Sequence, residues 1–465
     1  MVEAEARSIL ALRYMLDFRC IGSDCEDSCC ESGWSIYIDP EHLLKLRRTL
    51  PKEATGDPAA LPPFDHAVRM LPKNERSERA AALLILDEQG RCPFFSAGRL
   101  CRLQEASGEA ALPDTCSTYP RHINQVGQRT ELAGALSCPE VARRALLPSD
   151  ATDLVPAPSS LLGRGQLQFT APKGPSDVSG LHRSHATARP GRSHAAEHPQ
   201  APYRHLDVVR GTMARLLSLT DHSLQSRLFF TCFLSHKCAG LQQQPESPLD
   251  PSAFLQQAEP LNDPEVLAEL SRRLHESLRT GPLPLPLLLT VLRRQRQVPG
   301  GEAFSRLVVE MAQSYREDLP STDSLDLRSL PQPGHGDLLD PAYRARQERV
   351  DAVFRARIEH YLFNYARHFW MKDWYTQSPS LFIHAQGFLL RAALLRFVLL
   401  GHPQAQVAAQ QGATSGQALL DALAVRTFYS LSRTLEHSAG FRSALHEYIQ
   451  KSASTITDSI ALLSV

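Results

Sequence analysis

Residues 18–39 read FRCIGSDCEDSCCESGWSIYID and hold four of the ten cysteines of the chain. Four more follow in the phrases RCPFF, GRLC, DTCSTYPR and LSCPE, so eight thiols lie between residues 20 and 138. Packing alone does not gather so scarce a residue into one part of a chain. We therefore expect the chemistry of the protein to begin in this segment, and the rest to supply helical scaffold and connections.

Composition excludes several classes of protein. The 465 residues include 50 basic and 50 acidic side chains, so no net field favours nucleic acid or an anionic membrane. The first residues lack a basic leader with an apolar core, so no secretory signal is expected. One stretch, residues 381–400, is long enough to span a bilayer. Each of its two arginines would cost about 2.5 to 3.5 kcal/mol there, so we predict a buried helix in a cytoplasmic protein.

The cysteines of a protein in a reducing compartment bind metal or take part in catalysis more often than they form disulfides. Their spacing matches neither a zinc ribbon nor a ferredoxin, and position 32 is serine where radical enzymes that use S-adenosylmethionine need a third cysteine. Eight thiols suffice for two zinc sites or for one four-iron cluster with four thiols to spare. The alternative is a set of buried thiols that act as small apolar side chains. The predicted metal ligands are Cys20, Cys25, Cys29, Cys30, Cys92, Cys101, Cys116 and Cys138.

Periodicity predicts a mainly α protein. We expect a helix over residues 1–19, a short strand over 34–38, a helix over 41–50 capped by Asp39, and a strand or helix over 81–86. The predicted domains are a cysteine-rich, metal-stabilised domain with little strand (1–150), a linker rich in Pro, Gly, Ser and His (151–202), and a helical domain (203–465). Cys232 and Cys238 lie on an apolar helical face and are predicted to pack without binding metal.

The cysteine phrases, in this order, closely resemble the flagellin lysine-N-methylase (FliB-like) family, and more distantly a family of cysteine-rich zinc- or iron-chelating proteins. IEHYLFNYARHFW and FYSLSRTLEH resemble helical motifs of the methylase. The resemblance covers residues 1–150 and 203–460. It implies methyl transfer from S-adenosylmethionine to lysines of flagellin by a protein that carries an iron–sulfur cluster, of the 4Fe–4S type, on the matching cysteines.

Methyl transfer to lysine needs a neutral amine, so a base or an apolar channel must favour that form. The candidate residues are Tyr119 and Arg121 beside Cys116, Glu436 with His437, and Glu359 with His360. Each of these charged or imidazole groups has a structural alternative, such as an ion pair one helical turn away.

The site for the methyl donor is not evident. No strand is followed by G-x-G-x-x-G, and Gly163-Arg164-Gly165 has no strand signal before it. Two rival functions therefore stay open. One is a non-enzymatic module in which zinc or iron holds the domain together and the helices bind a partner. The other is a redox sensor whose thiols or cluster report oxidants.

Overall fold

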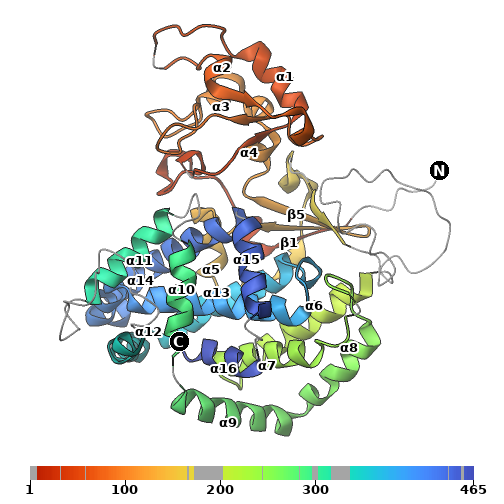
Figure 1. The fold of residues 1–465 in the computed structure, drawn as a ribbon, viewed down its shortest axis with the longest axis vertical. Helices are drawn as coiled ribbons and strands as arrows, with labels where there is room; N and C mark the ends of the chain where they lie inside the picture. Colours follow the sequence, from red (N-terminus) through yellow and green to blue (C-terminus); the bar gives the residue numbers. More distant parts are fainter. Residues whose placement is uncertain are drawn as a thin grey trace, which may run out of the picture. The chain divides into compact units, whose positions relative to one another are not determined.

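The computed structural model describes residues 8–171, 203–451 and 455–465, except residues 32, 58, 165, 166, 243, 282, 296–301, 316–335 and 438. The chain forms two compact units, whose elements are labelled in Figure 1. We call Met1–Ala142 with Asp153–Ala171 the N-terminal unit, and Arg143–Thr152 with Gln200–Val465 the helical unit. Helix α5 (Pro139–Leu146) begins in the first unit and ends in the second.

Short elements form the first part of the N-terminal unit. Its three-stranded antiparallel sheet has the order β2-β4-β3. Helix α1 starts where predicted, because the Asp39 carboxylate accepts a hydrogen bond from the His42 amide at 3.0 Å and proline occupies the first turn. The elements are β2 (Tyr37–Ile38), α1 (Pro40–Thr49), α2 (Phe64–Ala67), β3 (Val68–Met70), β4 (Ala82–Leu84), α3 (Arg102–Ser107) and α4 (Asp114–Thr118).

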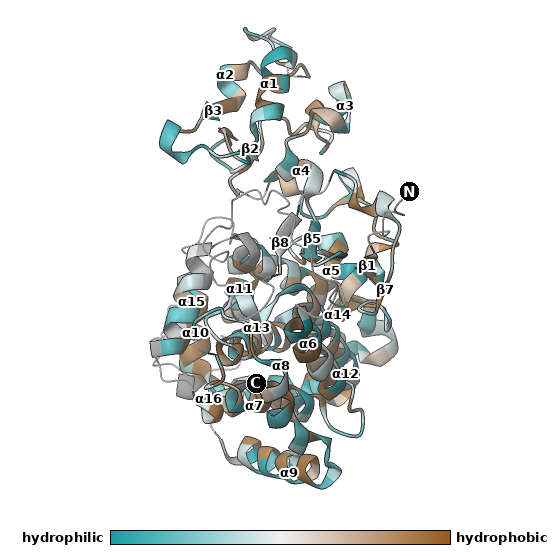
Figure 2. Cartoon of the chain, turned by 90° about the vertical axis from the view of Figure 1, so that its right-hand side faces the viewer, coloured by the Kyte–Doolittle hydropathy of each residue, from teal (hydrophilic) through white to brown (hydrophobic). Residues whose placement is uncertain are grey.

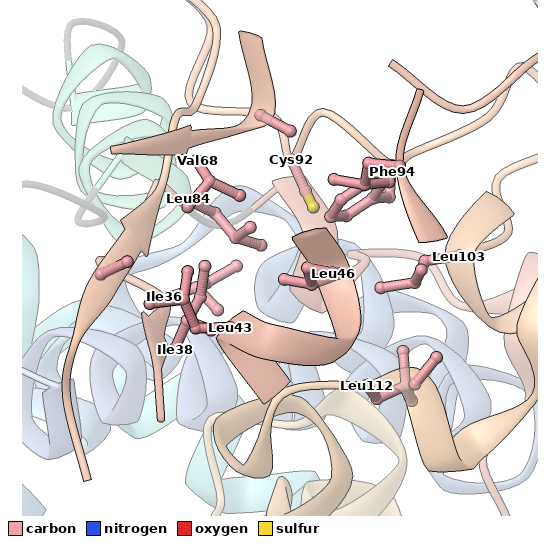
Figure 3. Packing of buried hydrophobic residues seen from close by; sticks show 14 of the residues in the cluster. Ile36, Ile38, Leu43, Leu46, Val68, Leu84, Cys92, Phe94, Leu103 and Leu112 are labelled. Atoms are coloured by element: carbon pink, nitrogen blue, oxygen red, sulfur yellow. The ribbon is translucent and has the colours of Figure 1, made fainter. Parts of the chain in front are cut away.

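The core of this part is small and includes a thiol. Leu46 of α1, Ile38 of β2 and Phe94 are fully or almost fully buried together, and the Cys92 side chain packs among them (Figure 3). Three further cysteines, Cys30, Cys101 and Cys116, are partly buried against the same cluster. Four of the eight predicted ligands therefore lie in or against an apolar core.

A five-stranded mixed sheet forms the second part of the N-terminal unit, in the order β7-β1-β6-β5-β8. Strands β5 and β6 form a hairpin whose turn contains Gly127 at φ +59°, and β1 and β8 pair parallel to β6 and β5. The strands are β1 (Ile9–Leu12), β5 (Arg121–Val126), β6 (Arg129–Gly134), β7 (Leu154–Pro156) and β8 (Leu167–Thr170).

Three sequence predictions about this unit need correction. Residues 9–12 form a strand and residues 13–15 a 3-10 helix, not part of a helix over 1–19, because β6 and β7 pair with this segment on both sides. The predicted strand over 34–38 contains only Tyr37–Ile38, whereas Ala82–Leu84 is a strand, one of the two predicted forms. The segment predicted as a linker contributes β7 and β8 to the sheet; residues 172–202 lie outside the described residues.

Every described secondary-structure element of the second unit is a helix, and the prediction of a mainly α protein is confirmed. Amphipathic helices such as α9 show both hydrophilic and hydrophobic residues in Figure 2. Gly412, at φ +80°, kinks α14. The helices are α6 (Arg204–Leu217), α7 (Leu224–Lys237), α8 (Pro251–Ala258), α9 (Pro264–Thr280), α10 (Leu285–Gln295), α11 (Glu302–Ser314), α12 (Gly336–Lys372), α13 (Leu381–Gly401), α14 (Pro403–His437), α15 (Ala439–Lys451) and α16 (Ile456–Leu463).

Helix α13 is the core helix of this unit and packs against α7, α12 and α14. It is the one described helix long and apolar enough to cross a membrane, but 83% of its apolar window is buried inside the protein. Its polar side chains have protein partners: His384 contacts the Ser378 hydroxyl at 3.0 Å, Gln386 donates to Ser459, and Arg396 pairs with Asp351 at 2.7 Å. The predicted buried helix with a polar stripe is confirmed.

Candidate metal centre

Two glycines bring the first cysteine loop against the Cys92 loop. The Gly33 amide donates to the Gly90 carbonyl at 3.2 Å, and a Cβ added at Gly90 would lie 2.9 Å from the Gly33 Cα. Since Gly90 also has φ +75°, only glycine fits this crossing without strain. Next to the crossing, the Cys92 amide donates to the Cys30 carbonyl at 2.8 Å. Cysteines far apart in sequence therefore become neighbours.

The loop around Cys25 is held by backbone and arginine contacts. The Cys25 amide donates to the Gly22 carbonyl at 3.2 Å, where Gly22 has φ +56°. Arg99, two residues before Cys101, donates to the Cys25 carbonyl at 2.8 Å and pairs with Glu31 at 3.4 Å. The guanidinium thus ties the first cysteine loop to the segment that carries Cys101.

Two other cysteines stand at helix starts. Cys101 is the residue before α3, and Cys138 is the residue before α5. Burial raises the pKa of both thiols; the Gln104 and Leu103 amides oppose this shift for Cys101, as the Val141 and Glu140 amides do for Cys138. Backbone amides at a helix start stabilise a thiolate, because their partial positive charges face it.

All eight thiols belong to one electrostatic group. Cys29 lies near its centre, close enough to Cys25, Cys30, Cys101, Cys116 and Cys138 to affect the pKa of each of these thiols. Cys20 acts on Cys25, and Cys92 acts on Cys30. The fold thus gathers the thiols that the sequence singled out.

The environment opposes ionisation of these thiols in the absence of a cation. Burial, reinforced by neighbouring thiolates, raises the pKa of Cys116 well above its ordinary value, and burial raises that of Cys138 to about 12. For Cys30 the Cys29 thiol acts to lower the pKa, but the Cys92 thiol and burial together raise it to about 12. A bound metal would reverse this balance, because its positive charge stabilises thiolates.

Ligand separation distinguishes the kinds of metal site. A tetrahedral zinc ion with Zn–S bonds of about 2.3 Å holds its sulfurs about 3.8 Å apart, whereas a multi-iron cluster spreads its ligands further. Among the described residues, the group of three whose ligand atoms all lie within 4.8 Å of one another is Asp39, His42 and Asp114, with no cysteine in it. Among the described residues, therefore, no three thiols lie within 4.8 Å of one another.

The Asp39–His42–Asp114 group binds cations of the protein itself. His42 Nδ1 lies 2.9 Å from both Asp39 carboxylate oxygens, and the Arg164 guanidinium approaches His42 Nε2 at 2.7 Å and Asp114 at 3.3 Å. Lys45 Nζ lies 3.3 Å from the same Nε2. Arg164 is thus the cation that faces the Asp114 carboxylate, while Lys45 also pairs with Glu41 at 2.8 Å.

This group instead fixes helix α4, which carries Cys116. The Asp114 amide donates to Asp39 at 3.2 Å, and the Thr115 hydroxyl donates to the Tyr37 carbonyl at 3.0 Å. Sequence reasoning noted Asp39 as a helix cap and Arg164 as part of a Gly-Arg-Gly phrase, but did not connect them. No local signal joins His42 to a residue 122 positions away.

The predicted catalytic residues of the N-terminal unit border the thiols. The Tyr119 ring packs on Trp34 with centroids 5.2 Å apart, and its hydroxyl lies 3.3 Å from that of Ser137, next to Cys138. Arg121 donates to the Leu161 carbonyl at 2.8 Å and to the Ser117 carbonyl at 3.3 Å. Tyr119 thus links the Cys116 and Cys138 segments, while the Arg121 guanidinium holds backbone; their predicted catalytic roles stay predictions.

The remaining candidates lie in the helical unit. His360 contacts the Leu147 carbonyl at 3.0 Å, and burial lowers its pKa. Glu359 lines a pocket of about 160 Å³ whose walls come from α7, α12, α13 and α16. Glu436 and His437 end α14, and their side chains lie outside the described residues.

The helical unit is similar to a known protein family. The model of the FliB lysine N-methylase C-terminal domain matches residues 210–463, more than half of the chain and nearly all of the helical unit. The chain belongs to the FliB lysine N-methylase family. The resemblance predicted from the cysteine phrases and helical motifs is confirmed.

Two curated relatives are lysine-N-methylases, from Salmonella typhimurium (33% identical) and Salmonella choleraesuis (32% identical), each over 141 residues. These matches cover 30% of this chain and 33% of the relative, so the chain matches about a third of the methylases' length. The flagellar biosynthetic protein FliU of Salmonella muenchen is 33% identical over 141 residues, 30% of this chain and 78% of FliU. No solved structure matches.

Proposed function

We propose that this protein transfers methyl groups from S-adenosylmethionine to lysine ε-amines of flagellin, and that the cysteine group of the N-terminal unit holds an iron–sulfur cluster required for the activity. Membership of the FliB lysine N-methylase family supports lysine methylation. Two relatives are named lysine-N-methylase and a third is named a flagellar biosynthetic protein, which supports flagellin as the substrate. A methylase that acts on newly made flagellin would work in the cytoplasm.

The observation that carries the proposal is the convergence of eight thiols, which five separate phrases of the sequence supply, within a methylase family. Their chemistry fits an iron–sulfur cluster, since thiolate sulfur is its usual ligand. The candidates to hold it are the eight predicted ligands, Cys20, Cys25, Cys29, Cys30, Cys92, Cys101, Cys116 and Cys138. When bound, the cluster would supply a redox-active iron centre beside the reaction.

The reaction itself places demands on the chain. The lone pair of the neutral lysine nitrogen forms a bond to the methyl carbon, the carbon–sulfur bond of the donor breaks, and S-adenosylhomocysteine leaves. The nitrogen then carries one proton too many, which a base or water must remove. Tyr119, beside the thiols, and Glu436 with His437 in the helical unit are the proton acceptors that we propose.

The test is to co-express the full chain with flagellin from its host and to measure the intact mass of the flagellin. We expect increments of about 14 Da on lysine peptides, one for each methyl group. Cys25→Ala should abolish them, and Cys238→Ala, a buried thiol of the helical unit, should leave them unchanged. Unmodified flagellin from a wild-type protein that holds its iron would reject the proposal; stoichiometric zinc in a colourless protein would instead favour a structural module.

A further inference from the structure

One segment of the N-terminal unit contacts the chain at both ends of the helix that carries Cys116. This segment is the 3-10 turn Ser159–Leu162 followed by Gly163 and Arg164, and it lies in the stretch predicted as linker. Helix α4 has five residues and begins after Pro113, whose side chain cannot cap it. A helix of little more than one turn is not stable by itself, so contacts from elsewhere must hold it in place.

Arg164 holds the chain on the N-terminal side of α4. Its guanidinium donates to the Glu109 carbonyl at 2.6 Å and to the Leu112 carbonyl at 2.9 Å, and it pairs with the Asp114 carboxylate at 3.3 Å. A planar fork of five N–H donors can serve several acceptors at once, whereas a lysine ammonium is a compact point charge. One side chain therefore fixes the path of the chain that leads into α4.

Arg121 holds the other end of α4 and connects it to the same segment. Its Nε donates to the Leu161 carbonyl at 2.8 Å, and its Nη1 donates to the Ser117 carbonyl at 3.3 Å. Ser117 is the residue directly after Cys116. The two arginines therefore contact the chain on opposite sides of Cys116, and both belong to or bind residues 159–164.

Gly163 lies between these two contacts. Its φ of +54° and ψ of −133° are rarely adopted by residues with a side chain. A Cβ at this position would lie 3.8 Å from the Arg121 guanidinium, an ordinary contact, so the positive φ is what requires glycine. The Gly-Arg part of the phrase that suggested a nucleotide loop thus has a use in the fold, because it brings Arg164 to the chain before α4.

We propose that Arg164 and Arg121 are positioning residues that hold Cys116 where an iron–sulfur cluster of the N-terminal unit needs its thiolate. This inference rests on the proposed function, in which the cysteine group binds that cluster. Cys116 packs against the same apolar core as Cys30 and Cys92, so a displacement of α4 changes its distance from the other thiols. Each arginine acts on the thiol through the backbone that carries it.

The first test is hydrogen exchange of the full-length protein, purified without oxygen and measured by mass spectrometry. The amides of Cys116, Ser117 and Tyr119 bond to carbonyls of the same turn, so their exchange reports whether α4 is held. Arg164→Gln removes the fork and should speed this exchange about tenfold. Strand β4 of the same unit should exchange as in the wild type. Equally faster exchange in both elements would show a general loss of folding and overturn the local role.

The second test measures how firmly the cluster is held. An iron chelator is added to the purified protein, and the loss of visible absorbance gives the rate of iron release. Arg164→Gln and Arg121→Gln should each release iron about tenfold faster than the wild type, as is typical when a group behind a metal ligand is removed. Arg164→Lys keeps the charge without the fork and should recover only part of the difference. Full recovery by lysine would assign the effect to charge and overturn the proposal.

Arg76→Gln is the matched control. Arg76 also donates to a backbone carbonyl of the N-terminal unit, that of Leu71 at 2.8 Å, but it lies in the connection between β3 and β4. This variant should match the wild type in the exchange of α4 and in iron release. If Arg164→Gln behaves like Arg76→Gln in both measurements, the positioning role is wrong.

Flagellin methylation separates this proposal from the proposed function. If the wild type holds its cluster but methylates no flagellin, methylation of flagellin is wrong, while exchange and iron release still decide the role of the arginines. If the wild type methylates flagellin and Arg164→Gln keeps wild-type exchange and iron release, the positioning role fails alone. The two failures are thus distinguishable.

Discussion

Cysteine side chains have different surroundings in the two units. In the helical unit, Cys232 is fully buried and donates to the Ser459 hydroxyl at 3.2 Å, and Cys238 is buried just after α7. In the N-terminal unit, Cys92 is buried, the other thiols of the group are partly buried or exposed, and each lies near other thiols. Burial raises the pKa of Cys232 and of Cys138 alike to about 12, so neither burial nor pKa separates the two sets. The number of neighbouring thiols separates them, because a metal site needs several ligands at one place, whereas a single thiol can fill space in an apolar core.

The largest expected effect tests this difference directly. Cys116→Ala removes a thiol that is coupled to Cys29, Cys30 and Cys101, and should abolish bound iron. Cys232→Ala is the matched control, with a similar loss of buried volume but no neighbouring thiol, and should retain full iron content. Iron analysis and visible absorbance of anaerobically purified protein measure both. Equal iron in the two variants would remove Cys116 from the ligand set.

In the helical unit, a partly buried ion pair connects helices α12 and α14 and should stabilise the fold. Arg357 donates to both oxygens of Asp421, at 2.9 and 3.0 Å, and the Tyr361 hydroxyl donates to the same carboxylate. Asp421→Ala leaves the partly buried Arg357 guanidinium with the Leu147 carbonyl and takes the acceptor from the Tyr361 hydroxyl, and should lower the free energy of unfolding by about 2 kcal/mol.

An exposed ion pair provides the control for that change. Glu276 and Arg272 interact across one turn of α9 with both side chains 62% exposed. Glu276→Ala should leave the unfolding midpoint in urea nearly unchanged, since solvent screens such pairs. If both variants unfold at the same urea concentration, the Asp421 group is not a structural element.

The third prediction concerns the backbone crossing that joins the cysteine loops. Alanine at Gly90 meets an unfavourable positive φ and also the Gly33 backbone, and should cost about 2 kcal/mol or more. Gly56 has φ +78° with nothing within 4 Å, so Gly56→Ala meets only the backbone strain and should cost about 1 kcal/mol. Thermal unfolding measures both, and only Gly90→Ala should also reduce bound iron. Iron loss in Gly56→Ala would point to a general effect of folding.

The same crossing shows where sequence reasoning stops. Local signals sufficed for α1, with its Asp39 cap, and for α13, whose length and polar stripe fit a buried helix. The set of candidate metal ligands could also be predicted, because eight clustered cysteines in a protein expected in a reducing compartment suggest metal binding. The spatial neighbours of these residues could not be predicted. The Cys92 amide bonds the Cys30 carbonyl beside the Gly33–Gly90 contact, and His42 contacts Arg164, and both contacts join residues far apart in the sequence. The strand β1 was mistaken for helix because its partners, β6 and β7, lie more than a hundred residues later.

The smallest expected effect comes from one imidazole of the helical unit. The His384 ring stacks on Phe369 with centroids 4.5 Å apart and contacts the Ser378 hydroxyl at 3.0 Å. Its pKa is lowered to about 3, mainly by burial; the charge of Asp373 opposes this shift and that of Arg391 adds to it. The unfolded chain has an ordinary histidine pKa near 6.5. The folded protein therefore keeps this ring neutral at pH values where the unfolded chain binds a proton.

A folded-state pKa below the unfolded value gives stability that is complete above about pH 6.5 and is lost as the pH falls toward 3. Between pH 6.5 and 5.5 the contribution of His384 should fall by about 1 kcal/mol. His384→Phe keeps an aromatic ring beside Phe369 but cannot bind a proton, so its stability should fall less over that interval, by this amount. Urea unfolding of both proteins at the two pH values measures the difference. The other buried histidines contribute equally to both proteins, so equal losses would mean that His384 has an ordinary pKa in the folded state.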